Sequence, residues 1–281
     1  MEYFAVSQTK YRFLVCSDID GQSATKLTEK FVNQDPEFDA VILSGPFTHQ
    51  ELTTPEEIAV MGGDIASMIA QFENLVCRVI YLPSEYDPIN IRNEQLNLTP
   101  NSLNIHGRQI NLTNNLKLLG FSEKNEQLNS GKIPSNVDRS AESDDELEDV
   151  AVVSGQSSCI IKEMLQKSIM NNNEEQRNNI TTTTPPTTMN TGIFMLNYRY
   201  SHTLNQLLFH MNTELGAANI SLCIITSADC PETSRLPVKF NKLNIVAPKS
   251  LRQGGHYVIV DIEHNTMTQL WDNITINAHI L

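Results

Sequence analysis

The most constraining feature of this sequence is a short apolar segment that ends in two closely spaced carboxylates. Residues 13–16 (Phe-Leu-Val-Cys) are all apolar, and Asp18 and Asp20 follow before Gly21 allows the backbone to turn. A short, wholly apolar run is typical of a strand buried on both faces. Side chains just past the carboxyl end of such a strand often face a ligand-binding crevice. A short Asp-x-Asp motif is most simply a polar loop at a strand end. Because two carboxylates are costly to bury without a cation or water, Asp18 and Asp20 are also candidate cation ligands.

The segments that follow alternate between helical and strand patterns. Apolar spacing after Gly21 predicts a helix that ends before Asp35, and residues 39–44 form a second apolar strand. Thr54 is a predicted helix N-cap, followed by proline and completed as a capping box by Glu57. A third strand is expected over 77–82. The order strand, helix, strand, helix, strand predicts parallel strands joined by right-handed crossovers.

The remaining ordered segments are short strands and one helix. A glycine-rich turn is expected over 248–255, and an amphipathic helix over 204–215. Residues 266–271 and 274–280 are expected to pair with each other as a terminal antiparallel hairpin. Further strands are predicted over 103–105, 116–119, 192–197, 221–226, 243–247 and 256–261.

Residues 122–190 have a different composition from the rest of the chain. They contain an acidic run over 142–149, an asparagine triplet and a threonine tract followed by two prolines. Such tracts bury too little apolar surface to offset the entropy lost on ordering. We therefore predict one domain over residues 1–281 that carries a disordered low-complexity insertion.

Charge and cysteine content narrow the functional classes. A formal charge of −13 argues against direct nucleic-acid binding, which requires a basic face. The five cysteines include no Cys-x-x-Cys pair and are typical of reduced thiols inside cells. The N-terminal segment carries Glu2 and lacks the apolar core of a signal peptide, so no signal peptide is expected. No apolar stretch is long enough to cross a membrane. These features predict an intracellular protein, cytoplasmic or nuclear, with no membrane association.

The order of strands and turns resembles that of the calcineurin-like metallophosphoesterases. In that family the first three strands end Asp-x-His, Gly-Asp and Gly-Asn-His-Asp. Later strands end in His and in Gly-His-x-His, and an Asn-Pro-Gly-Ser-Leu turn precedes a strand like Tyr-Ala-Val-Val-Asp. The matching stretches here are Asp18-Ile19-Asp20, Gly45-Pro46, Ser84-Glu85-Tyr86-Asp87, Leu196-Asn197-Tyr198, Thr226-Ser227-Ala228-Asp229, and Ala247-Pro248-Lys249-Ser250-Leu251 before Tyr257-Val-Ile-Val-Asp261.

The resemblance implies an α/β fold, specifically a four-layer α-β-β-α sandwich. It also implies that an active member binds two divalent metals, which share one aspartate and activate a water for attack on phosphorus. Such a centre requires a dense set of histidine, aspartate and asparagine ligands, because two neighbouring cations must be held and neutralised together.

The first half of the ligand set is largely replaced in this sequence. Asp18 matches the first ligand, whereas Asp20 stands in place of a histidine and could still bind a cation through oxygen. Pro46 stands in place of the bridging aspartate, and its side chain offers no donor. Glu85 replaces the ligand asparagine, while Asp87 matches the final aspartate of that motif.

The second half of the set is also replaced. Tyr86 stands where a histidine is expected to stabilise the leaving group, and Asn197 replaces the next histidine ligand. Both histidines are missing around Ser227-Ala228-Asp229, and none of the seven histidines falls at a motif position. A tyrosine of ordinary pKa is a poor acid at neutral pH, so Tyr86 does not restore the missing function.

These departures favour a non-catalytic interaction or scaffold module. The sequence then has no catalytic residue, and Asp18, Asp20, Glu85 and Asp87 form a vestigial metal site. No cofactor is expected to bind tightly, although one Mg²⁺ or Mn²⁺ could be held weakly. Gly-Pro-Phe after the second strand and Pro-Ser-x-x-Asp after the third also resemble the B subunits of replicative DNA polymerases, which carry an inactivated form of this fold. A protein partner of unknown identity is expected.

Three alternatives remain open on the sequence. The four acidic residues could form a reduced, carboxylate-rich site of a metal-dependent phosphoester hydrolase. Asp18 and Asp87 could instead cap neighbouring turns by accepting hydrogen bonds from backbone amides. The chain could also be an unrelated α/β binding protein.

Overall fold

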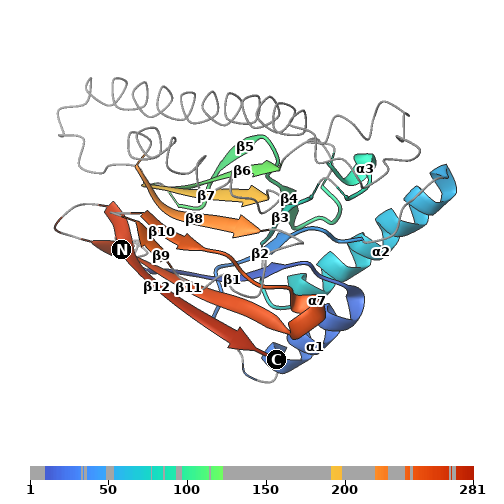
Figure 1. The fold of residues 1–281 in the computed structure, drawn as a ribbon, viewed down its shortest axis with the longest axis horizontal. Coiled ribbons are helices and arrows are strands. Elements are labelled where there is room, and N and C mark those ends of the chain that lie inside the picture. Colours follow the sequence, from blue (N-terminus) through green and yellow to red (C-terminus); the bar gives the residue numbers. More distant parts are fainter. Residues whose placement is uncertain are drawn as a thin grey trace, which may run out of the picture.

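The computed structural model describes residues 10–32, 34, 37–48, 54–76, 78–84, 86–92, 97–113, 115–122, 191–197, 219–226, 238–240, 243–265, 267 and 270–281. These residues form two six-stranded sheets, with helices packed on the first of them, in an α/β fold (Figure 1). In spatial order, the first sheet contains β12 (Leu270–Ile280), β11 (His256–Asn265), β1 (Lys10–Ser17), β2 (Ala40–Ser44), β3 (Val79–Leu82) and β4 (Ser102–Asn104). The second contains β5 (Arg108–Asn111), β6 (Leu116–Ser122), β7 (Thr191–Asn197), β8 (Ile220–Thr226), β10 (Leu243–Val246) and β9 (Val238–Phe240).

Parallel pairing dominates the centre of each sheet. Strands β1 to β4 pair in parallel, as the alternation of strands and helices predicts for β1, β2 and β3. Strands β6, β7, β8 and β10 are likewise parallel neighbours. Antiparallel strands lie at the margins, where β11 pairs with β1 and β12 pairs with β11. The carboxyl ends of β1, β2 and β3 therefore lie along one edge of the first sheet.

The helices begin where local sequence signals place them. Helix α1 (Gly21–Val32) follows the first carboxylate pair, and α2 (Pro55–Glu73) begins after Thr54 with the predicted capping box. The Thr54 side chain accepts a hydrogen bond from the Glu57 amide, and the Glu57 carboxylate accepts one from the Thr54 amide. Two single-turn helices, α3 (Ile89–Arg92) and α7 (Leu251–Gly254), lie close to strand ends.

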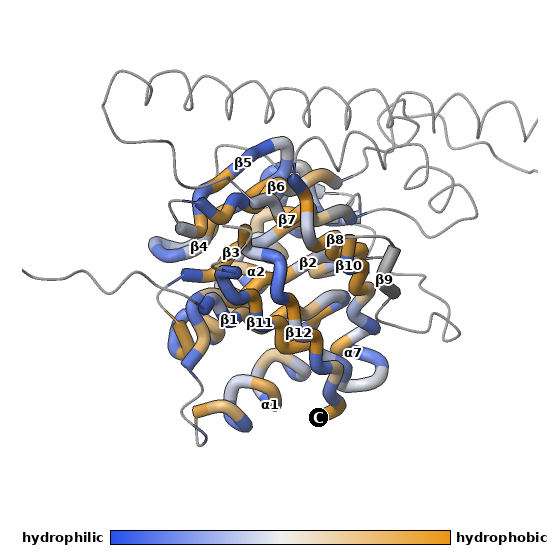
Figure 2. The backbone as a smooth tube through the Cα atoms, turned by 90° about the vertical axis from the view of Figure 1, so that its left-hand side faces the viewer, coloured by the Kyte–Doolittle hydropathy of each residue, from blue (hydrophilic) through white to orange (hydrophobic). Residues whose placement is uncertain are grey.

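Alternate residues of the first sheet face two different cores. Phe13 and Val15 of β1 belong to the cluster between the sheets, whereas Leu14 and Cys16 pack beneath the helices. Figure 2 shows that hydrophobic residues are concentrated in the strands. Each central strand is buried on both faces, which explains its continuous apolar sequence. The inter-sheet cluster includes Ile42, Ile80, Leu118, Ile193 and Ile224, and the cluster under α1 and α2 includes Leu27, Phe31, Ile69 and Phe72.

Several expectations from the sequence are corrected. Residues 266–271 and 274–280 do not form a hairpin, because Trp271 and Ile274 lie in the single strand β12, which pairs with β11. Strands β5 and β9 were not expected; both are short and lie at sheet margins. Part of the turn over 248–255 is the helix α7.

One residue of the predicted insertion over 122–190 lies in a strand instead. Ser122 ends β6, and residues 123–190 lie outside the described residues, as does the helix expected over 204–215. Within the described residues no helix has the length and apolar character needed to span a membrane.

Candidate functional site

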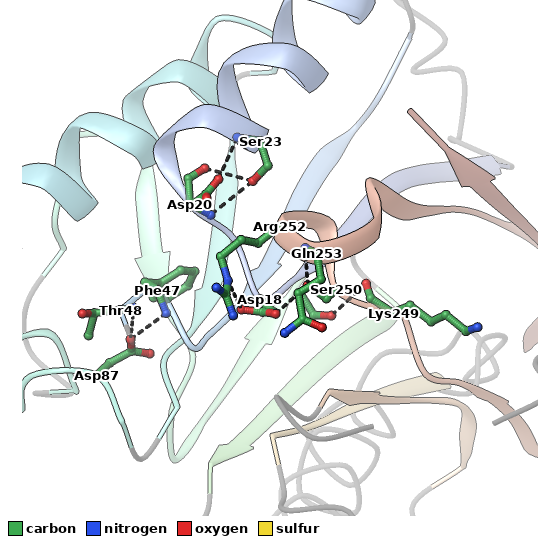
Figure 3. Close-up of polar contacts among 11 residues, drawn as sticks. Asp18, Asp20, Ser23, Phe47, Thr48, Asp87, Lys249, Ser250, Arg252 and Gln253 are labelled. Atoms are coloured by element: carbon green, nitrogen blue, oxygen red, sulfur yellow. Dashed lines mark hydrogen bonds and ion pairs between the residues drawn. The ribbon is translucent and has the colours of Figure 1, made fainter. Parts of the chain in front are cut away.

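The carboxyl ends of β1, β2 and β3 bring together three turns. The amide of Asp18, after β1, donates to the Ser44 carbonyl at 3.1 Å, and the amide of Gly45, after β2, donates to the Leu82 carbonyl at 2.9 Å. Because these strands are parallel, Asp18 and Asp87 both lie at the same edge of the first sheet (Figure 3). This is the edge at which α/β proteins commonly bind ligands.

Asp18 is buried and paired with the turn that precedes β11. Its Oδ2 accepts a hydrogen bond from Ser250 Oγ at 2.5 Å, and its Oδ1 lies 3.2 Å from Arg252 Nε. The Arg252 amide also donates to the Asp18 carbonyl at 3.0 Å. The Asp18 side chain is 1% exposed, whereas that of Arg252 is 31% exposed. A protein guanidinium thus balances the charge of a buried carboxylate (Figure 3).

The local fold explains why Ser250 and Arg252 reach Asp18. Ser17 forms an isolated parallel bridge with Ser250, and Ser17 Oγ donates to the Pro248 carbonyl at 3.0 Å. Ser250 caps α7 by accepting a hydrogen bond from the Gln253 amide at 2.8 Å. The cap and the bridge fix the start of α7 beside the end of β1.

Asp87 joins the turn after β2 to the turn after β3. Its Oδ1 accepts hydrogen bonds from the amides of Phe47 at 2.7 Å and Thr48 at 3.2 Å. Its Oδ2 accepts from the amide and the hydroxyl of Ser84 at 2.7 and 3.1 Å. Burial raises the pKa of Asp87 to about 6, even though these hydrogen bonds favour the ionised form. Asp87 therefore caps two turns, which is the structural role that the sequence left open.

The Asp87 carboxylate packs directly against Gly45, where there is no space for a side chain. A Cβ atom on Gly45 would lie 2.2 Å from Asp87 Oδ2 and 2.7 Å from the Ser84 amide nitrogen. The second of these neighbours is backbone and cannot rotate away. Close approach of the two turns therefore depends on the missing side chain.

The third carboxylate, Asp20, caps the amino-terminal end of helix α1. Its Oδ1 accepts a hydrogen bond from the Ser23 amide at 2.7 Å, and Ser23 Oγ donates to the Asp20 carbonyl at 3.0 Å. Figure 3 draws Asp20 beside Ser23 at the start of α1. This arrangement is an N-cap, in which the carboxylate pairs with an amide of the first helical turn.

Other predicted positions are only partly described. Glu85 lies outside the described residues, as do Ser227, Ala228 and Asp229. The Tyr86 side chain is 43% exposed. Asn197 is buried and lies at the end of β7.

A buried polar network ties the two sheets together near this edge. Ser44, Asn197 and Thr226 are the last residues of β2, β7 and β8. Ser44 Oγ lies 2.5 Å from Thr226 Oγ1, and Asn197 Nδ2 donates to Ser44 Oγ and to the Gly45 carbonyl, both at 2.9 Å. The cross-linking roles of Ser44 and Thr226 were not predicted from the sequence. The available signal was a hydroxyl residue at the end of each of two mainly apolar strands.

The donors that the structure describes at this edge do not fit the two-metal centre that the resemblance implies. Asp18 is paired with Arg252, Asp87 accepts four hydrogen bonds, and Asn197 turns its amide nitrogen into the network. Pro46 offers no side-chain donor at the bridging position. The part of the chain that the structure describes contains no cluster of three or more histidine, cysteine, aspartate or glutamate residues suited to a metal ion.

Comparisons with known proteins give similarity in fold only. No family model and no curated protein matches the chain. The chain is similar to the crystal structure of TT1561 of Thermus thermophilus, with a TM-score of 0.53, 14% sequence identity, and coverage of 97% of this chain and 99% of that one. A second solved structure has a TM-score of 0.51 and 10% identity over 95% of this chain and 98% of its own. At these identities the comparisons establish an α/β fold shared along nearly the full length of each chain.

Proposed function

We propose that this chain is a non-catalytic relative of the calcineurin-like metallophosphoesterases that serves as an interaction or scaffold module for a protein partner. In this proposal its two sheets and flanking helices correspond to the four-layer α-β-β-α sandwich of that family. The order of the motif positions from Asp18 to Asp261 supports the correspondence, because strand ends and turns occur in the family's sequence order.

The ion pair between Asp18 and Arg252 is the observation that carries the proposal. In an active member, the aspartate at this position would face a metal cation. Here the side chain is 1% exposed and its Oδ1 lies 3.2 Å from the guanidinium. The charge that a metal would supply is supplied by the protein, so the carboxylate can be buried without an added cation.

The inter-sheet network supports the same proposal. A metal centre lying between the ends of two sheets also cross-links them. Hydrogen bonds among Ser44, Asn197 and Thr226 supply a direct cross-link in this chain. Loss of catalytic metals then leaves the fold intact, and its surfaces remain available for protein contacts.

A hydrolase with a reduced, carboxylate-rich site is the second candidate. The placement of Asp18 and Asp87 at one edge of parallel strands favours it. One hard cation bound there would keep most of its waters and lower their pKa much less than a zinc centre does. The two candidates therefore differ in whether metal-dependent turnover exists.

Hydrolysis assays on purified protein separate these candidates. Wild type, Asp18→Asn/Asp87→Asn and the control Asp64→Asn are compared on an aryl phosphate and a bis-aryl phosphate with Mn²⁺, Mg²⁺ and Zn²⁺. Asp64 is an exposed carboxylate on α2. We expect no metal-dependent turnover in any of the three proteins. Turnover in wild type and Asp64→Asn that disappears in a folded double variant would establish the hydrolase instead.

A further inference from the structure

The outer margin of the first sheet is formed by β12, and residues 273–280 of this strand pair with β11 on one side only in the described sheet. Residues 273–280 run in unbroken register against β11, and the bulge between Glu263 and His264 lies beyond the Asn273 end. Figure 1 shows β12 at the margin of the described fold. Strands β11 and β1 separate it from β2 and β3, so this edge is distinct from the candidate site.

The hydrogen-bonding pattern identifies which main-chain groups point outward. The Leu281 amide donates to the Gly255 carbonyl at 2.9 Å. In an antiparallel ladder, bonded positions alternate, so the odd-numbered residues of this segment face β11. The amides and carbonyls of the even-numbered residues are therefore directed away from the sheet, and these residues are Ile274, Ile276, Ala278 and Ile280.

The same four residues form an apolar stripe on one face of β12. Ile274 and Ile276 are partly buried and pack against the cluster between the sheets. Ile280 continues the stripe outward and is 63% exposed. The opposite face carries uncharged polar residues and a histidine: Asn273, Thr275, Asn277 and His279.

This edge lacks the features that usually prevent strand pairing. Natural edge strands are protected by lysine, proline, inward-facing charge or bulges. Residues 273–280 contain no proline, lysine, arginine, aspartate or glutamate, and no bulge interrupts them. The segment is therefore suited to accept another strand by main-chain hydrogen bonding.

We propose that β12 pairs with β12 of a second copy of this chain, in antiparallel orientation about a two-fold axis at Asn277. In this register Ile274 faces Ile280 of the second copy and Ile276 faces its Ala278. All four are outward-bonding positions, so the two strands exchange main-chain hydrogen bonds at each of these pairs.

When two β12 strands pair in this register, side chains of similar polarity meet on both faces of the sheet. Apolar residues meet apolar residues on the face that continues the inter-sheet core. On the other face Thr275 meets His279, and the two Asn277 side chains meet each other. A shift by one residue would place outward-bonding groups opposite inward-bonding ones, so the ladder cannot form in that register. The result is an isologous dimer with a continuous twelve-stranded sheet.

Sedimentation velocity of the full chain tests this dimer over a range of protein concentrations. We expect wild type to approach twice the monomer mass as concentration rises. Asn277→Lys, which sets two like charges against each other at the axis, should remain monomeric. Ala278→Pro should also remain monomeric, because it removes an amide that points away from β11 and would bond the second copy. The matched controls are Ala278→Val, which keeps that amide, and Val32→Lys, whose parent residue on α1 is 63% exposed like Ile280.

Cysteine cross-linking tests the register independently of stability. At a non-hydrogen-bonded pair the Cα atoms lie about 4.5 Å apart, within disulfide range. Asn277→Cys should give a covalent dimer under mild oxidation, well above the wild-type background. Thr275→Cys should not, because its counterpart would lie about 14 Å away along the strands. A wild-type monomer at every concentration, a dimer unaffected by Asn277→Lys, or equal cross-linking of both cysteine variants would overturn the proposal.

Discussion

The Arg252 guanidinium nitrogen Nε lies 3.2 Å from Oδ1 of Asp18, a side chain that is 1% exposed. Ser250 holds the other oxygen of the same carboxylate. The ion pair joins the end of β1 to α7, which are far apart in the sequence. It should therefore contribute to folding in the absence of any added cation.

Removing the cation of this pair should destabilise the fold. We expect Arg252→Ala to lower the free energy of unfolding by about 1–3 kcal/mol, because a buried carboxylate loses a charged hydrogen-bond donor. Urea unfolding measures the change, with the exposed Lys26→Ala on α1 as control. Adding Asp18→Asn to Arg252→Ala should cost less than the sum of the single changes. Strict additivity in this double-mutant cycle would show that the two side chains do not interact.

Asp87 should make stability depend on pH in a mildly acidic range. Burial raises its pKa from 3.8 to about 6, so the folded state binds its proton more tightly than the unfolded state does. This contribution is fully present below pH about 4 and is lost as pH rises through about 6. Two pKa units correspond to about 3 kcal/mol.

The comparison with Asp87→Asn isolates this contribution. The variant cannot titrate, so the stability of wild type relative to it should decrease as pH rises from about 4 to about 7. Unfolding curves in urea at several pH values give this difference. A stability difference that is constant across the range would contradict the raised pKa.

The inter-sheet network should show energetic coupling between its members. We expect Ser44→Ala and Thr226→Val each to lower the free energy of unfolding by about 1–2 kcal/mol, because each change removes a buried hydrogen bond. The double variant should lose less than the sum, since the shared bond can be lost only once. Thr25→Ala on the exposed face of α1 is the control. Coupling indistinguishable from zero would show that Ser44 and Thr226 do not bridge the sheets.

Two glycines should respond oppositely to alanine. Gly45→Ala places a Cβ against the Asp87 carboxylate and the Ser84 backbone, and we expect a loss of about 1–3 kcal/mol. Gly21→Ala introduces a Cβ with no atom within 4 Å and should be neutral or stabilising by up to about 1 kcal/mol. Thermal melts of both variants provide the measurement. A Gly45→Ala protein as stable as wild type would show that the two turns can separate.

Much of the fold could be predicted because the local strand and helix signals coincide with the segments that are buried. The apolar runs before Asp18 and around Ile80 formed strands, and the capping box at Thr54 began α2 as expected. The hairpin expected near the carboxyl terminus was wrong because Asp272 and Asn273 resemble turn residues. They instead lie in β12, where pairing with β11 decides the structure.

The candidate site was only partly predictable for a related reason. Strand order placed Asp18 and Asp87 at one edge, since each follows a parallel strand. The partners of these carboxylates could not be deduced, because Arg252 is separated from Asp18 by 234 positions in the sequence. The roles of Ser44 and Thr226 depend on how the two sheets pack face to face, which no local pattern encodes.

Metal content of the purified protein decides whether the edge formed by Asp18 and Asp87 holds a metal centre. The chain is produced in medium supplemented with Mn²⁺, Zn²⁺ and iron, dialysed without chelator, and examined by elemental analysis. The ion pair of Asp18 with Arg252 and the absence of a donor at Pro46 lead us to expect well below one equivalent of any of these metals per chain. Two equivalents retained through dialysis would contradict a non-catalytic role and indicate a two-metal enzyme.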